Sequence, residues 1–254
     1  MTRAEQENIR RYVLRLGDNT LILGQQVSAW CGHAPVLEED IALANVALDL
    51  IGQATNWLNY AAQLSSEETT ADNLAFLRDE REFTNLLLTE QPDKSYAHSI
   101  MRQFLFDSWH YPMLKALMMS KDCVISEIAT KSSKEVAYHL ERSTELVISL
   151  GCGTDTSYGL MQDALNDLWR FTGELCEADA LDNEILSIGI GPDLIEINNE
   201  FQSHIKEVFS LSTLTVPENT PMRLGGKSGI HSEAMGPILT TMQHLQRAYP
   251  GVSW

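Results

Sequence analysis

Apolar residues recur at steps of three and four along almost the whole chain, which is the spacing of one face of an α-helix. Ile9, Val13, Leu16, Leu23 and Val27 set this pattern near the start, and no segment sustains the alternation typical of a strand. The pattern predicts an all-α fold with helices at about 8–30, 38–63, 74–89, 96–120, 123–150, 158–178, 193–211 and 231–248.

Glycine, proline, asparagine and aspartate gather between these segments, as at 31–35, 91–94, 151–156 and 188–192. The second helix is apolar nearly all round and is expected to be the most buried. The last helix is expected to open at His231, Ser232 and Glu233, after a glycine-rich loop. Four long helices followed by shorter ones predict a four-helix bundle with additional C-terminal helices, in one domain over 1–254.

Polar side chains interrupt the inward apolar faces of the four long helices, so that each helix brings a carboxylate toward the middle. Ferritin-like proteins have this layout, because they bind two iron ions with carboxylates from two helices and Glu-x-x-His pairs from two others. The polar set consists of Asp18, Asp49, Asp107, His110, Glu135 and His139. These residues are the candidate metal-ligand positions.

The ligand pattern is nevertheless incomplete. Gly52 stands three residues after Asp49, where an imidazole is required, and no acidic residue stands three residues before His139. Two interpretations remain open: a rearranged metal site, or a buried network in which basic side chains neutralise the acids. The network is favoured, because metal ligands must hold their geometry closely. Its candidate bases are Lys131, Arg142, Arg102 and Arg170.

The chain is strongly acidic, with a net charge of −17 from 18 basic and 35 acidic residues. This charge opposes binding to nucleic acid or to an anionic membrane surface. The four cysteines lie far apart without a Cys-x-x-Cys pair, and no segment has the apolar length of a membrane span. We therefore expect a cytoplasmic protein with reduced cysteines.

Several short motifs carry a resemblance that covers essentially the whole chain. They are LRLGDN at 14–19, AWCGHAP at 29–35, LDLIGQA at 48–54, RDEREF at 78–83, KEVAYHL at 134–140, LWRFT at 168–172 and GGKSGIH at 225–231. In their number, order and spacing they are similar to the C subunits of ring-1,2-phenylacetyl-CoA epoxidases, which are bacterial oxygenases of phenylacetate degradation.

The resemblance implies a ferritin-like, non-catalytic subunit without a cofactor of its own. Its partner would be a homologous A subunit that carries the di-iron centre, and a reductase component would supply electrons from NADPH. The complex would add one oxygen atom to the aromatic ring of phenylacetyl-CoA. A catalytic di-iron oxygenase subunit and an iron-storage protein remain the alternatives.

The resemblance also suggests residues that line a subunit boundary next to the CoA portion of the substrate. These are Glu82, Phe83, Thr84, Asn85, Asn183, Glu184 and Ile185. By composition alone, the first four belong to an ordinary solvated helix surface. A separate expectation concerns the partner interface, because residues 86–88 and 111–119 offer more apolar surface than one inward stripe can use.

Overall fold

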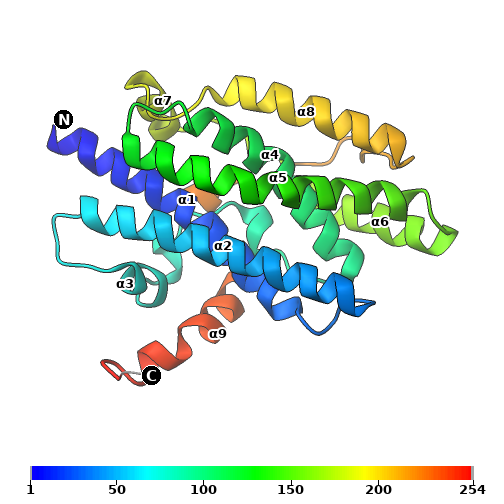
Figure 1. Ribbon diagram of the computed structural model, residues 1–254, viewed down its shortest axis with the longest axis horizontal. Helices are drawn as coiled ribbons and strands as arrows, with labels where there is room; N and C mark the ends of the chain where they lie inside the picture. The colour runs from blue at the N-terminus through cyan, green and yellow to red at the C-terminus, as the bar shows by residue number, and fades with distance from the viewer. Residues whose placement is uncertain (1, 253–254) are drawn as a thin grey trace. The chain divides into compact units, whose positions relative to one another are not determined.

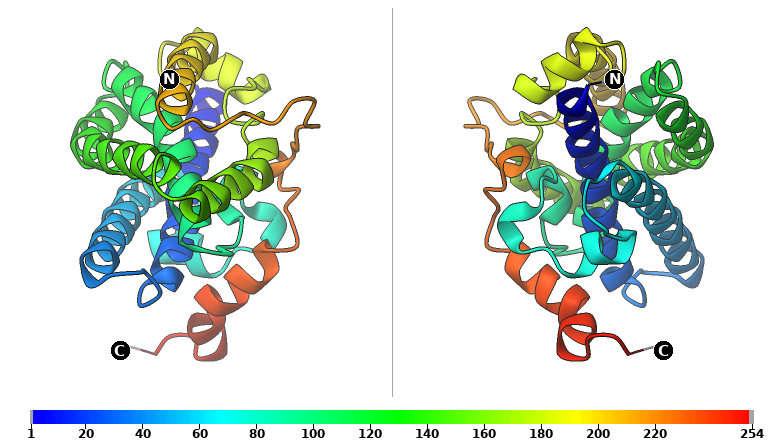
Figure 2. Two further views of the ribbon diagram at one scale, coloured as in Figure 1. Left: turned by 90° about the vertical axis from the view of Figure 1, so that its right-hand side faces the viewer. Right: turned by 90° about the vertical axis from the view of Figure 1, so that its left-hand side faces the viewer.

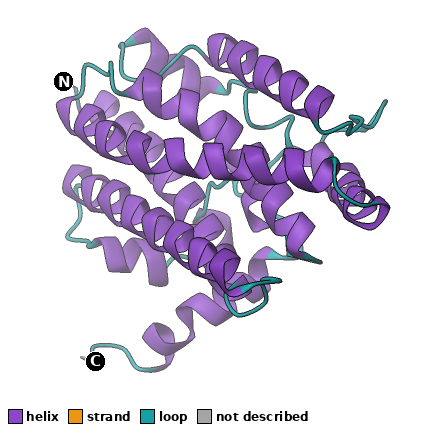
Figure 3. Ribbon diagram, turned by 45° about the vertical axis from the view of Figure 1, so that its right-hand side comes forward, coloured by secondary structure: helices purple, strands orange, loops and turns teal. Residues whose placement is uncertain are grey.

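The computed structural model describes residues 2–252, and over that range it contains helices and no strand (Figure 3). The predicted all-α class is therefore confirmed. The chain forms two compact units, of which unit 1 comprises Met1–Cys31, Ile41–Pro92 and Gly225–Trp254, and unit 2 comprises Gly32–Asp40 and Asp93–Leu224. The expectation of a single domain over 1–254 stays a prediction.

Unit 1 is built on two long helices, α1 (Arg3–Trp30) and α2 (Leu37–Leu64), the latter from Ile41 onward. Two glycines of α1 let them pack closely, since a Cβ on Gly17 or Gly24 would lie 2.9 Å from side-chain atoms of Leu58 or Ile51. Its remaining elements are α3 (Ala71–Phe76), η1 (Glu80–Glu82), η2 (Leu87–Glu90), η4 (Gly226–Ser228) and α9 (Met235–Ala248).

Unit 2 is organised around α4 (Tyr96–Leu117), which contacts α5 (Cys123–Gly151), α6 (Asp155–Leu168) and α8 (Leu194–Leu211) (Figure 1). Its other elements are η3 (Trp169–Phe171) and α7 (Ala180–Ser187). Side-chain caps from Ser95, Asp122 and Asp193 fix the starts of α4, α5 and α8. Nearly every residue of α4 is buried, whereas α2 exposes one face, so the expectation that the second helix is the most buried was wrong.

The predicted helix at 74–89 was also wrong. The α-helix ends at Phe76, and the chain continues through the two short turns η1 and η2. In this segment, side-chain hydrogen bonds to backbone carbonyls take the place of the backbone hydrogen bonds of a helix. Arg78 Nε donates to the carbonyl of Leu74, and Thr89 Oγ1 donates to the carbonyl of Leu86. The leucines at 86–88 are buried rather than available to a partner.

Three further boundaries differ from the sequence pattern. The predicted helix at 158–178 ends at Leu168 and gives way to η3 and a turn, while α7, capped by Asp179, was not predicted. The last helix begins at Met235 rather than at His231. Between α8 and α9 the chain runs mostly as loop, drawn from gold to orange in Figure 2.

The apolar run at 111–119 does not form the exposed surface that was expected. Met113, Leu114 and Leu117 are buried, and among the apolar side chains of this run only Met119 is strongly exposed, at 84%. Pro112 lies inside α4, as the pattern suggested. No helix within residues 2–252 combines the length and apolar character that crossing a membrane requires.

Candidate functional site

A buried polar seam lies between α4 and α5 in unit 2. Asp107 is fully buried and accepts hydrogen bonds from Gln103 Nε2 at 2.7 Å and from Ser143 Oγ at 3.1 Å. His110 and His139 lie one turn further along the two helices and are also buried. The helices α4 and α5 run antiparallel, so positions 103, 107 and 110 of α4 lie opposite positions 143 and 139 of α5. Residues distant in sequence therefore share one seam.

Burial dominates the electrostatics of this seam. It raises the pKa of Asp107 to about 7, although the nearby His139 and the hydrogen bonds from Gln103 and Ser143 favour the carboxylate. Burial, together with the nearby His139, lowers the pKa of His110 from 6.5 to about 3. At neutral pH the seam therefore holds a neutral His110 imidazole, and Asp107 keeps its proton to a much higher pH than an exposed aspartate does.

Asp18 in unit 1 is fully buried and paired with Arg78. Both terminal nitrogens of the Arg78 guanidinium donate to its carboxylate, as do the backbone N–H of Thr84 at 2.9 Å and the hydroxyl of Thr84 at 3.2 Å. The guanidinium also donates to the carbonyl of Glu82 and lies 4.0 Å from the ring centroid of Phe83. Asp18 is thus paired with a base, Arg78, while the preference for a buried network over a metal site stays a prediction.

Arg78 was not among the bases expected to neutralise the acids. Arg102 pairs with Asp93, and Arg142 pairs with Glu39. No periodic pattern marked Arg78 as a partner, because it lies in an irregular segment 60 residues away from Asp18. The sequence offered one signal only: a buried carboxylate such as Asp18 requires a basic partner. It did not indicate that this partner is Arg78.

These residues fit a di-iron centre poorly. The Asp18 carboxylate is already engaged by a guanidinium and by Thr84, and both oxygens of Asp107 accept hydrogen bonds. Within residues 2–252, no group of three or more His, Cys, Asp or Glu side chains is placed to hold a metal ion. Asp49 and Glu135 are half-buried, in unit 1 and unit 2 respectively, and their predicted meeting with Asp18 and Asp107 stays a prediction.

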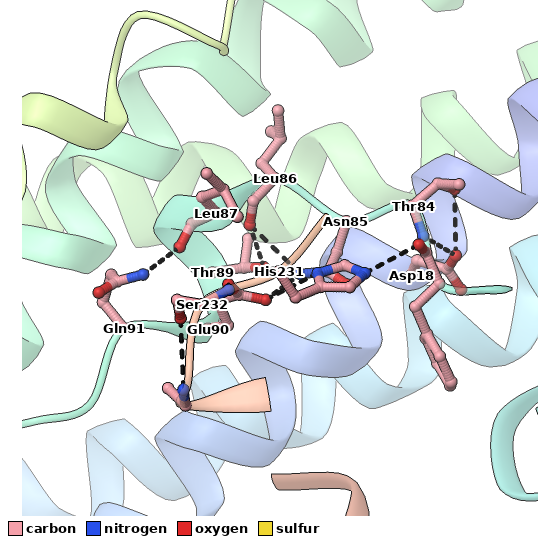
Figure 4. Close-up of polar contacts among 12 residues, drawn as sticks. Asp18, Thr84, Asn85, Leu86, Leu87, Thr89, Glu90, Gln91, His231 and Ser232 are labelled. Carbon is pink, nitrogen blue, oxygen red and sulfur yellow. Dashed lines mark hydrogen bonds and ion pairs between the residues drawn. The ribbon is translucent and has the colours of Figure 1, made fainter. Parts of the chain in front are cut away.

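A second buried ion pair of unit 1 joins the C-terminal segment to the turns after α3. His231 Nδ1 lies 3.0 Å from Glu90 Oε2, and His231 Nε2 lies 3.0 Å from the carbonyl oxygen of Phe83 (Figure 4). The backbone N–H of Ser232 and the amide of Asn85 donate to the same Glu90 carboxylate. Both imidazole nitrogens face acceptors, so the geometry favours the imidazolium form.

This pair makes stability depend on pH. Burial disfavours the His231 imidazolium, but its bond to Glu90, the Glu90 charge and the Phe83 carbonyl outweigh burial and raise its pKa above 6.5. A raised folded-state pKa gives stability that is complete below about pH 6.5 and is lost as the pH rises through the folded-state value.

We therefore expect His231→Ala to lower the unfolding free energy by about 1–3 kcal/mol at pH 6, with a smaller loss at pH 9. Urea denaturation at both pH values measures the difference. His244→Ala, which removes an exposed histidine of α9, is the matched control and should have little effect. If His231→Ala lost more unfolding free energy at pH 9 than at pH 6, the assigned ion pair between His231 and Glu90 would be contradicted.

The seven predicted substrate-contact residues occupy both units. Phe83 and Asn85 are buried, and with Thr84 they belong to the Asp18 and Glu90 networks, while Glu82 is exposed. The solvated-surface interpretation was therefore wrong for 83 and 85. In α7 of unit 2, Asn183 and Glu184 are exposed and Ile185 is buried. Their proposed role beside CoA stays a prediction.

Comparison with known proteins decides the family. A family model described as "Phenylacetic acid catabolic protein" matches residues 1–254. The chain belongs to this family. Among curated relatives, it is 48% identical over 243 residues to the C subunit of the 1,2-phenylacetyl-CoA epoxidase of Escherichia coli (strain K12), covering 96% of this chain and 98% of that protein. The predicted resemblance and the ferritin-like, all-α class are thereby confirmed.

Proposed function

We propose that this member of the phenylacetic acid catabolic family is a structural, non-catalytic subunit of a multicomponent oxygenase that epoxidises the aromatic ring of phenylacetyl-CoA. The observation that carries the proposal is the near full-length similarity to a protein named as the C subunit of that epoxidase. Its companion would be a homologous catalytic A subunit with a di-iron centre, and a reductase would deliver electrons from NADPH.

The chemistry of the buried acids supports a structural role. Four hydrogen-bond donations from Arg78 and Thr84 engage the Asp18 carboxylate, and replacing a guanidinium by a metal would leave that guanidinium buried without its anion. Gln103 and Ser143 engage Asp107 in the same way. In this proposal the chain's own residues stabilise the fold, and the chain contributes shape and surface to the complex.

The alternative is a catalytic subunit with a rearranged di-iron site. One feature of the seam supports this alternative. Nδ1 of the fully buried His110 has no hydrogen-bond partner among the described residues. A stacked contact with the Trp109 ring and a tilted contact with Phe106 hold that imidazole from the sides. An unpaired imidazole nitrogen is what a metal or a buried water would occupy.

Two measurements separate the proposals. The purified chain should contain iron far below two ions per chain and should lack the absorption of an oxo-bridged iron pair. In the assembled complex, Asp49→Asn should leave turnover per intact complex within about twofold of wild type, because no catalytic ligand is removed. The matching ligand substitution in the catalytic subunit is the control and should abolish turnover.

An iron content near two ions per isolated chain would overturn the structural proposal. So would an Asp49→Asn complex that assembles and melts as wild type does but has lost its turnover. Either result would establish the rearranged di-iron site as the correct interpretation.

A further inference from the structure

The fully exposed positions of α2 carry no charge over about six turns, and the half-buried Asp49 is the one charged residue between Ile41 and Gln63. The exposed residues follow one another at steps of three and four, and we call them the α2 stripe: Ile41, Asn45, Leu48, Gly52, Thr55, Asn59 and Gln63. Leu48 is 69% exposed and Ile41 is 53% exposed. Steps of three and four are the spacing at which one helix packs along another.

Other surface helices of the chain look different. The exposed positions of α5 include Lys131, Lys134, Glu141 and Glu145, and those of α8 include Glu196, Glu200, Lys206 and Glu207. A chain with 35 acidic and 18 basic residues has ample charge for its surface. An uncharged face of this length is therefore a specific feature of α2, and depletion of charge is typical of the centre of a protein interface.

Gly52 points to close approach by another backbone. A glycine inside a helix costs about 1 kcal/mol relative to alanine, and packing within the chain gives no reason for it here. A Cβ on Gly52 would meet no described atom within 4 Å, whereas one on Gly17 or Gly24 would clash with α2 side chains. The missing side chain leaves room for a helix from outside the chain.

The charges at the two ends of α2 select the kind of partner. The helix opens on the exposed Glu38 and the half-buried Asp40, with Glu39 between them already paired with Arg142, and the exposed Glu67 and Glu68 follow its end. A second copy of this chain would oppose acid to acid whether its α2 ran parallel or antiparallel. A helix with an uncharged middle and basic flanks would complement both ends.

We propose that the α2 stripe is the docking surface for a helix of the catalytic subunit, with an uncharged centre and basic residues at its ends. The inference rests on the proposed function for the identity of the partner. It replaces the interface expected at 86–88 and 111–119, which the fold buries for the most part.

The test measures the dissociation constant of the complex between the full chain and the catalytic subunit from the same organism. Leu48→Glu places a charge in the stripe and should weaken binding at least tenfold. Ile195→Glu is the matched control, because Ile195 is equally exposed, at 71%, but lies on α8. It should bind within about twofold of wild type, and both variants should melt as wild type does.

A second pair of variants separates docking from folding. Gly52→Ala should raise the melting temperature of the free chain by about 2 °C yet weaken the complex at least threefold. Gly159→Ala, in α6, also places its Cβ in open space. It should stabilise the chain to a similar extent and leave binding unchanged.

The contrary outcomes are distinguishable. Absence of any complex between the wild-type chain and the catalytic subunit would overturn the proposed function and this inference together. A complex that Leu48→Glu leaves intact would overturn the docking surface alone. A wild-type homodimer that Leu48→Glu dissociates would show that a second copy occupies the stripe, which would overturn the assigned partner.

Discussion

Arg78→Ala is expected to lower the free energy of unfolding by about 3–5 kcal/mol, because it leaves the Asp18 carboxylate buried without its counter-charge. Asp18 has no exposed surface, and Arg78 also holds the carbonyls of Leu74 and Glu82. Urea denaturation of the full chain measures the loss. Such a loss would exceed that of most single substitutions.

A double-variant cycle isolates the charge. Asp18→Asn introduced into the Arg78→Ala chain should restore part of the lost stability, because a neutral amide costs less to bury than an unpaired carboxylate. Arg10→Ala is the matched control, since Arg10 forms an exposed ion pair with Glu7 and should cost no more than about 1 kcal/mol. Equal losses for Arg78→Ala and Arg10→Ala would refute the assigned role.

Asp107→Asn is expected to stabilise the chain increasingly as the pH rises from 4 to 8. The folded-state pKa of Asp107 is raised from 3.8 to about 7, so the wild type keeps full stability below pH 3.8 and loses it as the pH rises toward 7. A shift of this size corresponds to about 4 kcal/mol at pH 8. Asparagine has no such pH dependence.

The surroundings of Asp107 can accommodate the amide. Gln103 Oε1 is buried without a hydrogen-bond partner among the described residues, so a flip of the Gln103 amide would let it accept a hydrogen bond from the introduced side-chain amide. Denaturation of both chains at several pH values gives the difference. Asp163→Asn, which neutralises an exposed carboxylate of α6, controls for the change in net charge. A difference that stays constant from pH 4 to 8 would refute the raised pKa.

The helical class and the buried acids were predictable from the sequence. Steps of three and four between apolar residues report the inner face of a helix regardless of what packs against it. Asp18 and Asp107 interrupt such faces, and the structure confirms that both are fully buried. The departure from the di-iron ligand pattern at Gly52 was visible for the same reason, because it depends only on spacing along one helix.

The partners of the buried acids were decided by the tertiary structure. Arg78 meets Asp18 across 60 residues and His231 meets Glu90 across 141. Both contacts use irregular segments, in which no period constrains where a side chain points. The identity of each partner therefore depends on how distant parts of unit 1 fold together.

The two faces of α2 show the same division. Its sequence is apolar nearly all round, which predicted that it is the most buried helix, yet Leu48 is exposed while Leu50 is buried. Local spacing determines which residues share a face of a helix. Whether a face is covered depends on which other segments reach it, and that is a property of the folded chain and its partners rather than of local sequence.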